Sequence, residues 1–510
     1  MTSADVVVFG ATAAGVTAAV AAREAGATTL LVAPDGHVGG MVSGGLSWTD
    51  VGDRRVLGGL ARRFYAAVAA HYHAPLWAVK GPEPHVAERL LVELLERAGV
   101  DVRLGEWLAE VSRAAGRIES LRTDRDTYAA TAFVDAGYEG DLMAAAGLPY
   151  AVGREDRSLY GESWAGRQPA TRPSRHNFPV LVSPFAEDGS LLPFVCPPEL
   201  DERGWPLDRS GDGDGGVQAY CFRVCLTDRP ENRLPLPLPS AYDPSRFELL
   251  RRFLVHAGPD LRASDLLGLV RDLLPSGKCD VNSIGPFSTN LLDGSNRGYP
   301  DGDAATRARI RAHHLEYTQA LLYYLSHDDG VPHRIRAEVG RWGLCADEFA
   351  DTGGWPHQLY VRDGRRLTGA HVLTERDLLD ARPQPDAVAL GSYNIDIREV
   401  QRTWRYLPEY VRTPAVFNEG YASVAVPPYA IPFRSLTPRR ADCENLLVPV
   451  CLSASHVAFG SVRMEPTLML LGHAAGAAAA QAARRECCVQ DVDVGALQRS
   501  LQADGQVLAA

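Results

Sequence analysis

The sequence predicts an α/β protein organised around a parallel β-sheet. A continuous apolar run at 5–10 is followed by a glycine turn and by alanines and valines with helical spacing, up to about residue 25. A second apolar run at 27–33 completes a βαβ unit, in which parallel strands are buried on both faces. Strand and helix patterns alternate again near the C-terminus, at 445–485. We therefore expect the two ends of the chain to share one domain.

The elements that follow the βαβ unit are predicted by their own patterns. Helical periodicity at 60–72 and 86–98 is followed by short strand patterns at 102–104 and 118–123. The stretch TAFVDAG is typical of a further strand, which ends near Gly137. We expect all of these elements to belong to the first domain.

The regular alternation is lost between about 154 and 410. This part contains a loop rich in Gly and Asp, proline-rich joints and a long helical pattern at 306–326. Afterwards NLLVPV (445–450) is typical of a strand, and Pro466–Arg485 of a helix. The change indicates one nucleotide-binding domain with a large insertion. We expect this domain at 1–153 and 430–495, the inserted substrate domain at 154–429, and a C-terminal tail at 496–510.

The composition excludes several classes of protein and partner. Of the 510 residues, 46% are hydrophobic and 23% charged, as in ordinary globular proteins. The chain has 52 basic and 63 acidic residues, so its formal net charge of -11 argues against a nucleic-acid partner. The stretch 467–483 is too polar for a membrane span, and we expect no membrane partner.

Cysteine use and the start of the chain indicate the compartment. The nine cysteines are scattered without a C-x-x-C pair, and the N-terminus lacks the pattern of a signal peptide, so we expect a cytoplasmic protein. Zinc-ligand spacings, H-E-x-x-H and G-x-S-x-G do not occur. We therefore expect neither a metal site nor a serine hydrolase. Whether the chain forms a homodimer stays open.

The first motif is G-x-T-x-x-G, formed by Gly10, Thr12 and Gly15 between the first strand and helix. Such a turn holds a pyrophosphate at the helix N-terminus, although Thr12 replaces the usual middle glycine and a structural turn is the alternative. Ala33 stands where an acidic residue normally binds a ribose. Either Asp35 takes over this role or the ribose is held by backbone and water.

A glycine-rich loop follows the second strand. It contains Gly39, Gly40, Gly44 and Gly45, and glycine lets a backbone approach a flat ring system closely. A nicotinamide dehydrogenase has no need of such a loop, whereas a flavoprotein has. His37, at its start, is either a covalent attachment point for a flavin or a residue that packs or hydrogen-bonds within the loop.

Two later segments carry further polar signals. FVDAGYEGD (133–141) is a strand that ends in a turn rich in glycine and acid, which is either part of the cofactor site or a solvated β-turn. The run 453–467 leads into the C-terminal helix, where Pro466 leaves the N–H groups of the first turn able to face an anion. Gly472 and Gly476 give this helix a bare side for close packing.

The quoted motifs extend over almost the whole chain. They include GATAAG, HVGGMVSGGL, VDAGYEGDLMAAAGLPYAVGRE, DVNSIGPFSTNLLDGSNRGYP, SYNIDIREVQR and NLLVPVCLSASHVAFGSVRMEP. On these motifs the sequence resembles the FAD-dependent oxidoreductase family whose members are often labelled xanthan lyase-like, and more remotely the succinate dehydrogenase and fumarate reductase flavoproteins. The resemblance implies FAD and a Rossmann-like (glutathione reductase-like) domain with a large inserted α+β substrate domain.

The sequence departs from the family pattern at two positions. Ala33 stands where the family usually has glutamate, and Arg398 where it has histidine. The second departure indicates a substrate different from that of better-matching relatives. The resemblance and the motifs together assign the cofactor to a set of backbone-rich segments. These are Gly10, Thr12, Ala13, Ala14, Gly15, Ala33, Asp35, Gly39, Gly40, Met41, Gly44, Gly45, Leu46, Asp135, Ala136, Glu139, Gly140, Pro466, Thr467 and Leu468.

The expected chemistry needs a base beside the flavin. His456 is the sequence-based choice because histidine titrates near neutral pH, with a buried structural histidine as the alternative. Arg463 is expected to bind a substrate oxygen or to stabilise reduced flavin. Polar residues of the insertion are the candidates for substrate binding. They are Arg223, Asn282, Arg362, Arg365, Tyr393 and Asp396.

Three functions stay open at this point. The first is hydride transfer from an alcohol or amine C–H of a small polar molecule, either sugar-like or from specialised metabolism, to FAD, with an unknown electron acceptor. The second is oxygen activation by a flavin monooxygenase. The third is a flavoprotein that binds a ligand without turnover.

Overall fold

The structure is a computed structural model that describes residues 1–48, 50–169, 175–407 and 413–509. The largest sheet among these residues has seven strands in the order β3-β2-β1-β6-β5-β4, with β19 paired to β6. The pairs β1–β2, β1–β6, β2–β3 and β19–β6 are parallel. The strands are β1 (Thr2–Phe9), β2 (Thr29–Ala33), β3 (Asp101–Leu104), β4 (Leu108–Ala114), β5 (Arg117–Thr123), β6 (Thr127–Asp135) and β19 (Leu446–Leu447).

The predicted α/β class and the first βαβ unit are confirmed. Val6, Val7 and Val8 of β1 are at most 1% exposed, because β2 and β6 flank the strand and both of its faces are covered. The helices that begin at Ala13 and Glu465 contact the strand, and Val7 packs in a second cluster with Ile118 and Leu121. The predicted helices are present with bounds shifted by one or two residues. They are α1 (Ala13–Glu24), α2 (Gly59–His71), α3 (Pro84–Ala98), α8 (Ala304–His327) and α12 (Glu465–Arg485).

The C-terminal strand is shorter than predicted. NLLVPV forms only the two-residue strand β19, in register with Phe133 and Val134 of β6. Pro449 has no N–H to donate, and Val448 turns its N–H to Leu436 instead of to the sheet. The antiparallel strand β4 was not predicted, because its residues are mostly exposed and show no clear apolar alternation.

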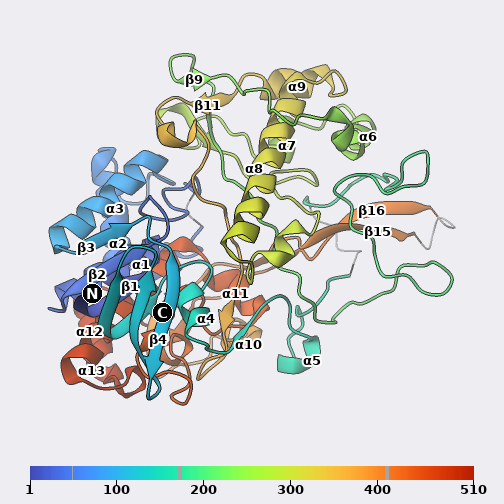
Figure 1. The fold of residues 1–510 in the computed structure, drawn as a ribbon. Helices are drawn as coiled ribbons and strands as arrows, with labels where there is room; N and C mark the ends of the chain where they lie inside the picture. Colours follow the sequence, from blue (N-terminus) through green and yellow to red (C-terminus); the bar gives the residue numbers. More distant parts are fainter. Residues whose placement is uncertain (49, 170–174, 408–412, 510) are drawn as a thin grey trace.

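Helices α1 and α12 pack closely against each other beside the sheet (Figure 1). A Cβ atom at Gly472 would lie 2.1 Å from the carbonyl oxygen of Ala14, and one at Gly476 would lie 2.0 Å from that of Ala18. The Thr17 hydroxyl donates a hydrogen bond to the carbonyl of Met469 at 2.8 Å. The predicted bare side of the C-terminal helix therefore brings the two ends of the chain together.

The variant Gly472→Ala is expected to lower the free energy of unfolding by about 1–3 kcal/mol, because the new methyl group would overlap backbone atoms that cannot move independently. Urea titration monitored by circular dichroism measures this loss. The matched control is Gly495→Ala in α13 (Val494–Ala503), where the nearest atom to a new Cβ is 3.4 Å away. This control should be neutral or more stable, and an equal loss in both variants would contradict the packing argument.

Of the remaining elements, α6, α7, α9, β9, β11, β15 and β16 lie in the upper and right-hand parts of Figure 1, whereas α4, α10 and α13 lie in its lower part. A four-stranded sheet in the order β10-β8-β11-β9 lies near α8, and β15 and β16 form a hairpin. The helices are α4 (Asp141–Ala145), α5 (Arg157–Tyr160), α6 (Glu248–His256), α7 (Ala263–Leu267), α9 (His333–Val339), α10 (Glu375–Leu379), α11 (His456–Val462) and α13 (Val494–Ala503). The strands are β7 (Tyr150–Ala151), β8 (Cys225–Thr227), β9 (Arg233–Leu234), β10 (Lys278–Asp280), β11 (Gly343–Cys345), β12 (Arg366–Leu367), β13 (Ala387–Gly391), β14 (Ile395–Ile397), β15 (Gln401–Tyr406), β16 (Pro414–Glu419), β17 (Ala422–Val424) and β18 (Tyr429–Pro432).

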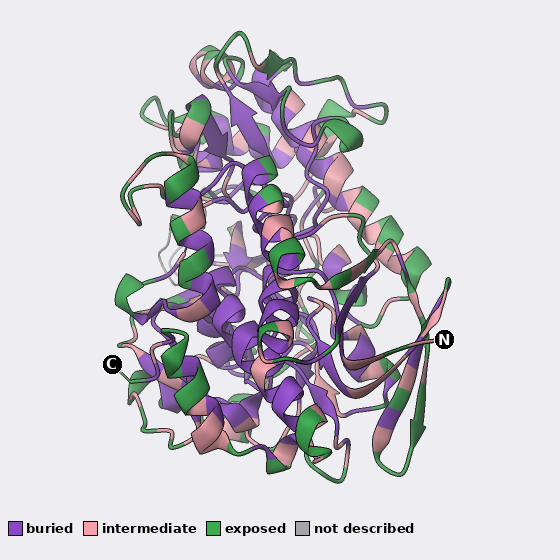
Figure 2. Ribbon diagram, turned by 90° about the vertical axis from the view of Figure 1, so that its left-hand side faces the viewer, coloured by how far each residue is buried: buried purple, intermediate pink, exposed green. Residues whose placement is uncertain are grey.

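Burial is continuous through the middle of the molecule. Figure 2 shows buried residues along its interior and exposed residues on the outer helices and loops. One large cluster of buried hydrophobic residues includes members of α1, α8 and α12, so the core joins the sheet region to the insertion. Among the described residues, none of the helices has both the length and the hydropathy that a membrane crossing requires.

Candidate active site

The turn between β1 and α1 is tightly packed. Gly10 has φ +107°, and a Cβ atom there would lie 2.5 Å from the backbone nitrogen of Gly137. The Thr12 hydroxyl accepts a hydrogen bond from the N–H of Gly15 at 3.1 Å and donates one to the carbonyl of Ala136 at 2.8 Å. Thr12 therefore caps α1 and ties the turn to the end of β6, which explains why threonine is tolerated in place of glycine.

The start of α1 suits an anion. The first N–H groups of a helix have no partner within the helix, and the Thr12 cap satisfies the one of Gly15. The N–H groups of Ala13 and Ala14 belong to the same first turn, where the positive end of the helix dipole lies. These residues fit the pyrophosphate of a dinucleotide.

The glycine-rich loop lies between this turn and the insertion. Gly39 donates its N–H to the carbonyl of Ala11 at 2.7 Å. Gly45 has φ +111°, and a Cβ atom there would lie 2.0 Å from the carbonyl oxygen of Arg223. At Gly40, the corresponding atom would lie 2.5 Å from the Tyr138 hydroxyl. Close packing against protein atoms accounts for Gly40 and Gly45. The contact of this loop with a flavin ring stays a prediction.

The C-terminal helix meets the same loop. Helix α12 begins at Glu465, one residue before the predicted start, and Pro466, Thr467 and Leu468 lie in its first turn. The buried Glu465 carboxylate accepts a hydrogen bond from the Tyr138 hydroxyl at 2.7 Å, and that hydroxyl accepts one from the N–H of Met41 at 2.9 Å. Burial raises the pKa of Glu465 to about 7. The contact brings together three of the segments assigned to the cofactor.

The other predicted cofactor residues differ in their burial and in the hydrogen bonds of their side chains. Ala33 is fully buried and offers no side-chain contact, while Asp35 at the same edge of the sheet is exposed. The buried Asp135 accepts hydrogen bonds from the N–H groups of Met143 (2.7 Å) and Gly137 (3.3 Å), and therefore shapes the turn after β6. Glu139 accepts a hydrogen bond from the Tyr299 hydroxyl at 3.2 Å. Because Ala33 has no polar side chain and Asp35 is exposed at the same edge of the sheet, Asp35 is the better candidate to bind the ribose.

His37 is held by two carboxylates. Its Nδ1 lies 3.1 Å from Glu88 and its Nε2 lies 3.0 Å from Asp351. The imidazole also stacks on His357, with ring centroids 3.8 Å apart. The hydrogen bond that His37 donates to Glu88 raises the pKa of the imidazole despite partial burial. Since both ring nitrogens have partners, the geometry favours the hydrogen-bonding role over covalent attachment.

A large polar cavity of about 840 Å³ lies beside these segments. A much smaller cavity shares Trp48, Asp50, Tyr360 and Met464 with it and extends to Leu46 and Pro466. The large cavity therefore adjoins both the glycine-rich loop and the start of α12. Its lining includes six residues predicted from the sequence: Arg223, Asn282, Arg362, Tyr393, Asp396 and Arg463.

Two arginines of the cavity are paired with aspartates. Arg223 forms a bidentate ion pair with Asp280, at 2.8 and 2.7 Å, and both side chains are buried. Arg463 donates hydrogen bonds to the Tyr360 hydroxyl at 2.7 Å and to Asp396, 3.2 Å from its carboxylate. Fixed pairs of this kind orient the walls of a polar site without leaving net charge.

Asp50 lines the cavity, although no sequence pattern predicted it. Burial raises its pKa to about 6, although the positive charge of Arg223 opposes the shift. The Tyr393 hydroxyl donates a hydrogen bond to it. A carboxylate with such a pKa accepts protons well near neutral pH. Its position five residues after the glycine-rich loop was the one available signal, since no motif surrounds it.

Two predicted site residues lie elsewhere. His456 is 1% exposed and does not line the cavity, and its Nδ1 lies 2.9 Å from Asp363. Helix α11, which the sequence patterns did not predict, begins at His456, and all seven of its residues are buried. Arg365 is bound to Asp141 and Asp301, outside the cavity. The structure therefore places neither the expected base nor this expected substrate ligand in the lining of the large cavity.

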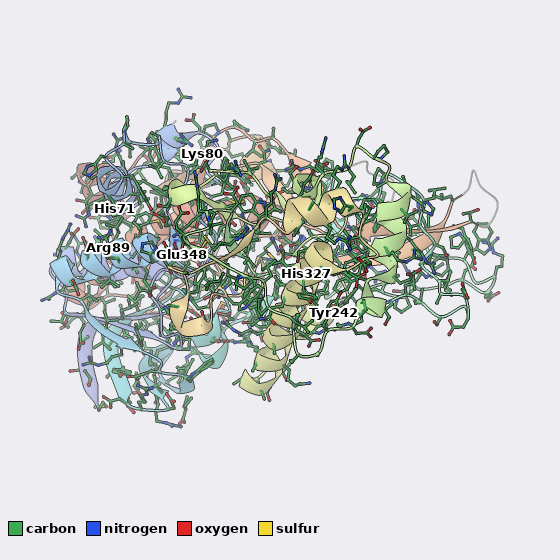
Figure 3. All side chains as sticks on the ribbon, turned by 90° about the horizontal axis from the view of Figure 1, so that it is seen from above. His71, Lys80, Arg89, Tyr242, His327 and Glu348 are labelled. Carbon is green, nitrogen blue, oxygen red and sulfur yellow. The ribbon has the colours of Figure 1, made fainter. Side chains whose placement is uncertain are left out.

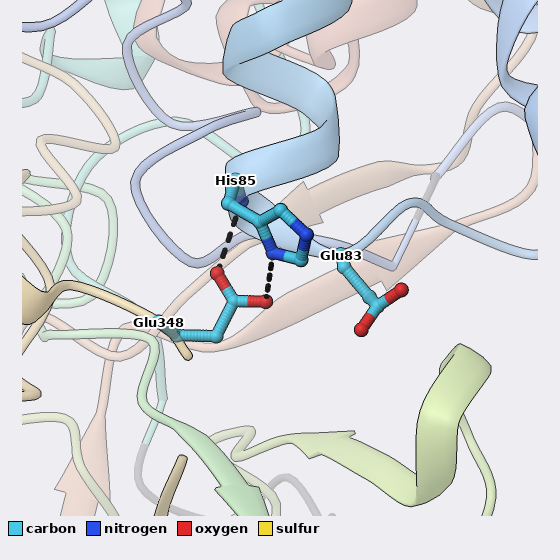
Figure 4. A group of neighbouring side chains, drawn as sticks. All are labelled: Glu83, His85 and Glu348. Atoms are coloured by element: carbon cyan, nitrogen blue, oxygen red, sulfur yellow. Dashed lines mark hydrogen bonds and ion pairs between the residues drawn. The ribbon is translucent and has the colours of Figure 1, made fainter. Parts of the chain in front are cut away.

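A cluster of metal-ligand types occurs next to α3. The ligand atoms of Glu83, His85 and Glu348 lie within 4.8 Å of one another (Figure 4). The buried ammonium of Lys278 contacts Glu83 at 2.7 Å and Glu348 at 2.6 Å. It also contacts Asp347 at 2.8 Å. The lysine therefore supplies the positive charge that a cation would bring, and this cluster is structural.

The glycine turn, the loop behind it and the adjoining polar cavity define a dinucleotide-dependent enzyme of the α/β class. The chain belongs to the FAD dependent oxidoreductase family, whose model matches residues 5–501. The match does not single out the xanthan lyase-like subgroup. A search of curated proteins finds no match.

Solved flavoprotein structures match parts of the chain. NikD, an unusual amino acid oxidase essential for nikkomycin biosynthesis, is 18% identical over 31% of this chain and 57% of its own, with a TM-score of 0.24. OxyS anhydrotetracycline hydroxylase from Streptomyces rimosus is 18% identical over 30% and 38% of the two chains, with a TM-score of 0.24. A steroid monooxygenase is 22% identical over 31% and 29%, with a TM-score of 0.21. Matches this partial carry no argument about substrate or reaction.

Proposed function

We propose that this enzyme oxidises an alcohol or amine C–H of a small polar substrate bound in the large cavity, and that Asp50 accepts the proton. The observation that supports this most directly is the position of Asp50, which lines both the large cavity and the small cavity leading to the glycine-rich loop. The proton acceptor thus borders the substrate space and the segments assigned to FAD.

FAD supplies the hydride acceptor for such a reaction when it is bound. The protein has to hold the substrate and remove the proton of its O–H or N–H group. Asp50 is suited to the second task because its pKa of about 6 leaves it deprotonated at neutral pH. Tyr393 orients the carboxylate by its hydrogen bond, and the Arg463–Asp396 pair shapes the neighbouring wall.

Anaerobic mixing of the FAD-loaded enzyme with candidate alcohols, amines and hydroxy acids tests the proposal. We expect loss of the oxidised-flavin absorbance with substrate alone. A flavin that stays oxidised with every candidate until a nicotinamide is added would favour a monooxygenase instead. A purified protein that takes up no FAD at all would contradict any redox role.

A further inference from the structure

Arg362 is a buried cation without a carboxylate partner in the part of the chain that the structure describes. It is 3% exposed and lines the large cavity. Its guanidinium donates hydrogen bonds to the carbonyl of Ala219, to the Cys221 sulfur at 3.3 Å and to the Ser283 hydroxyl at 3.3 Å. All three partners are neutral, so the positive charge is not compensated.

A second arginine lies beside it. Arg398 donates hydrogen bonds to the Ser283 carbonyl at 2.6 Å and to the Ser283 hydroxyl at 3.3 Å, so both guanidinium groups contact one serine. Its nearest carboxylate is Glu399, at 3.6 Å. His176 also contacts Arg398, but burial and this arginine lower the pKa of His176 to about 2, which keeps the imidazole neutral.

The charges of this corner do not balance. Arg362 and Arg398 bring two positive charges, and Glu399 provides one negative charge. The other cavity arginines are already compensated, Arg223 by Asp280 and Arg463 by Asp396. A buried charge without a partner is costly, and burial together with the charges of Arg398 and Arg463 lowers the pKa of Arg362. Asp50, a further carboxylate of the cavity, interacts with Arg223 and Arg463 rather than with Arg362. One excess positive charge therefore stays at the corner formed by Arg362 and Arg398.

We propose that Arg362 and Arg398 form a subsite for a carboxylate group of the substrate. A single carboxylate would neutralise the excess charge, and the planar guanidinium fork matches its two oxygens. A phosphate dianion would exceed the available charge. The inference rests on the proposed function and narrows its substrate class to carboxylic acids that carry an oxidisable alcohol or amine.

Isothermal titration of the FAD-loaded enzyme with benzoate tests the subsite without turnover. We expect benzoate to bind and the neutral isostere benzamide to bind much more weakly. Arg362→Met should weaken benzoate binding by about ten- to a hundredfold, the range typical of a hydrogen bond to a charged group. The matched control is Arg309→Met, which removes an exposed arginine of α8. Its benzoate affinity should equal that of the wild type.

Further variants keep the test decisive. If Arg362→Met fails to retain FAD, Arg362→Lys replaces it in the test, because lysine keeps the charge but lacks the planar guanidinium fork. Its affinity for benzoate should fall between the wild-type affinities for benzoate and for benzamide. Equal binding of benzoate and benzamide would overturn the subsite. Tighter binding of inorganic phosphate than of benzoate would overturn the carboxylate assignment.

The two proposals can fail separately. Benzoate binding that depends on Arg362, without flavin reduction by any hydroxy or amino acid, would support the subsite and contradict the proposed oxidation. Flavin reduction by neutral alcohols, equally fast in the wild type and in Arg362→Met, would support the oxidation and overturn the subsite.

Discussion

The variant Asp50→Asn is expected to reduce flavin about 10²- to 10⁴-fold more slowly than the wild type, the range associated with loss of a general base. Asparagine has nearly the same shape and still accepts a hydrogen bond from Tyr393, but it cannot take up the substrate proton. Anaerobic stopped-flow measurement of the reduction rate at saturating substrate gives the effect directly.

The matched control for this variant is Asp53→Asn, three residues further along the chain. Asp53 caps the short 3₁₀ helix that follows and does not line the cavity. This variant should reduce flavin at nearly the wild-type rate. A strong loss in His456→Asn, with little change in Asp50→Asn, would contradict the new assignment and restore the base expected from the sequence.

The same carboxylate predicts a pH profile. Because burial raises the pKa of Asp50 to about 6, the base is protonated and inactive below that value. We expect kcat/KM of the wild type to rise about tenfold per pH unit up to about 6 and then to level off. Asp50→Asn should lose this rise. A profile that is flat from pH 5 to 8 in the wild type would exclude Asp50 as the base.

The variant Lys278→Ala is expected to lower the free energy of unfolding by about 3–5 kcal/mol, as when one partner of a buried ion pair is removed. Lys278 is fully buried, and its ammonium contacts the buried carboxylates of Glu83 and Glu348. Without it, two like charges would be left in the same small space. Urea titration at neutral pH measures the loss.

Lys80→Ala is the matched control, because Lys80 and Lys278 are the only lysines in the sequence. Figure 3 shows Lys80 on the same side of the molecule as Glu348, and its side chain is exposed. Its ammonium lies 4.9 Å from the Trp48 ring, so a loss of about 0.5–1 kcal/mol is expected. Comparable losses in the two variants would contradict the structural role of the cluster.

Acid should affect the wild type and Lys278→Ala in opposite ways. Although burial opposes it, the Lys278 hydrogen bond and charge hold the pKa of Glu83 below its ordinary value of 4.5. The stability that this pair contributes is complete above pH 4.5 and is lost as the pH falls through the lower folded-state pKa. In Lys278→Ala, protonation relieves the repulsion instead, so the gap between the two proteins should narrow at low pH.

Much of the fold was predictable because its signals are local. Apolar runs and helical spacing identified β1, α1, α2, α3 and α12, since neighbouring residues in the sequence determine these patterns. Helix α11 was missed because only seven residues form it, too few for a clear period. The two-residue strand β19 was overestimated because Pro449 interrupts the pairing.

The candidate site was predictable only in part. Arg223, Arg362, Tyr393 and Asp396 do line the cavity, as residues of distinctive blocks. Asp50 stands in no motif, and its raised pKa comes from burial among residues that are distant in sequence. The choice of His456 relied on the ordinary titration of histidine, and its burial beside Asp363 was not visible in the chain.

The sequence by itself determined the α/β class and the FAD dependent oxidoreductase family, and it predicted the segments that hold the cofactor, because strand periods and glycine turns are properties of short stretches. The tertiary structure alone decided which charged groups meet and which are neutralised. Arg362 and Arg398 come from different segments, and only their convergence on Ser283 leaves an uncompensated positive charge. Burial and pairing of charges depend on contacts across the whole fold, so no local pattern encodes them.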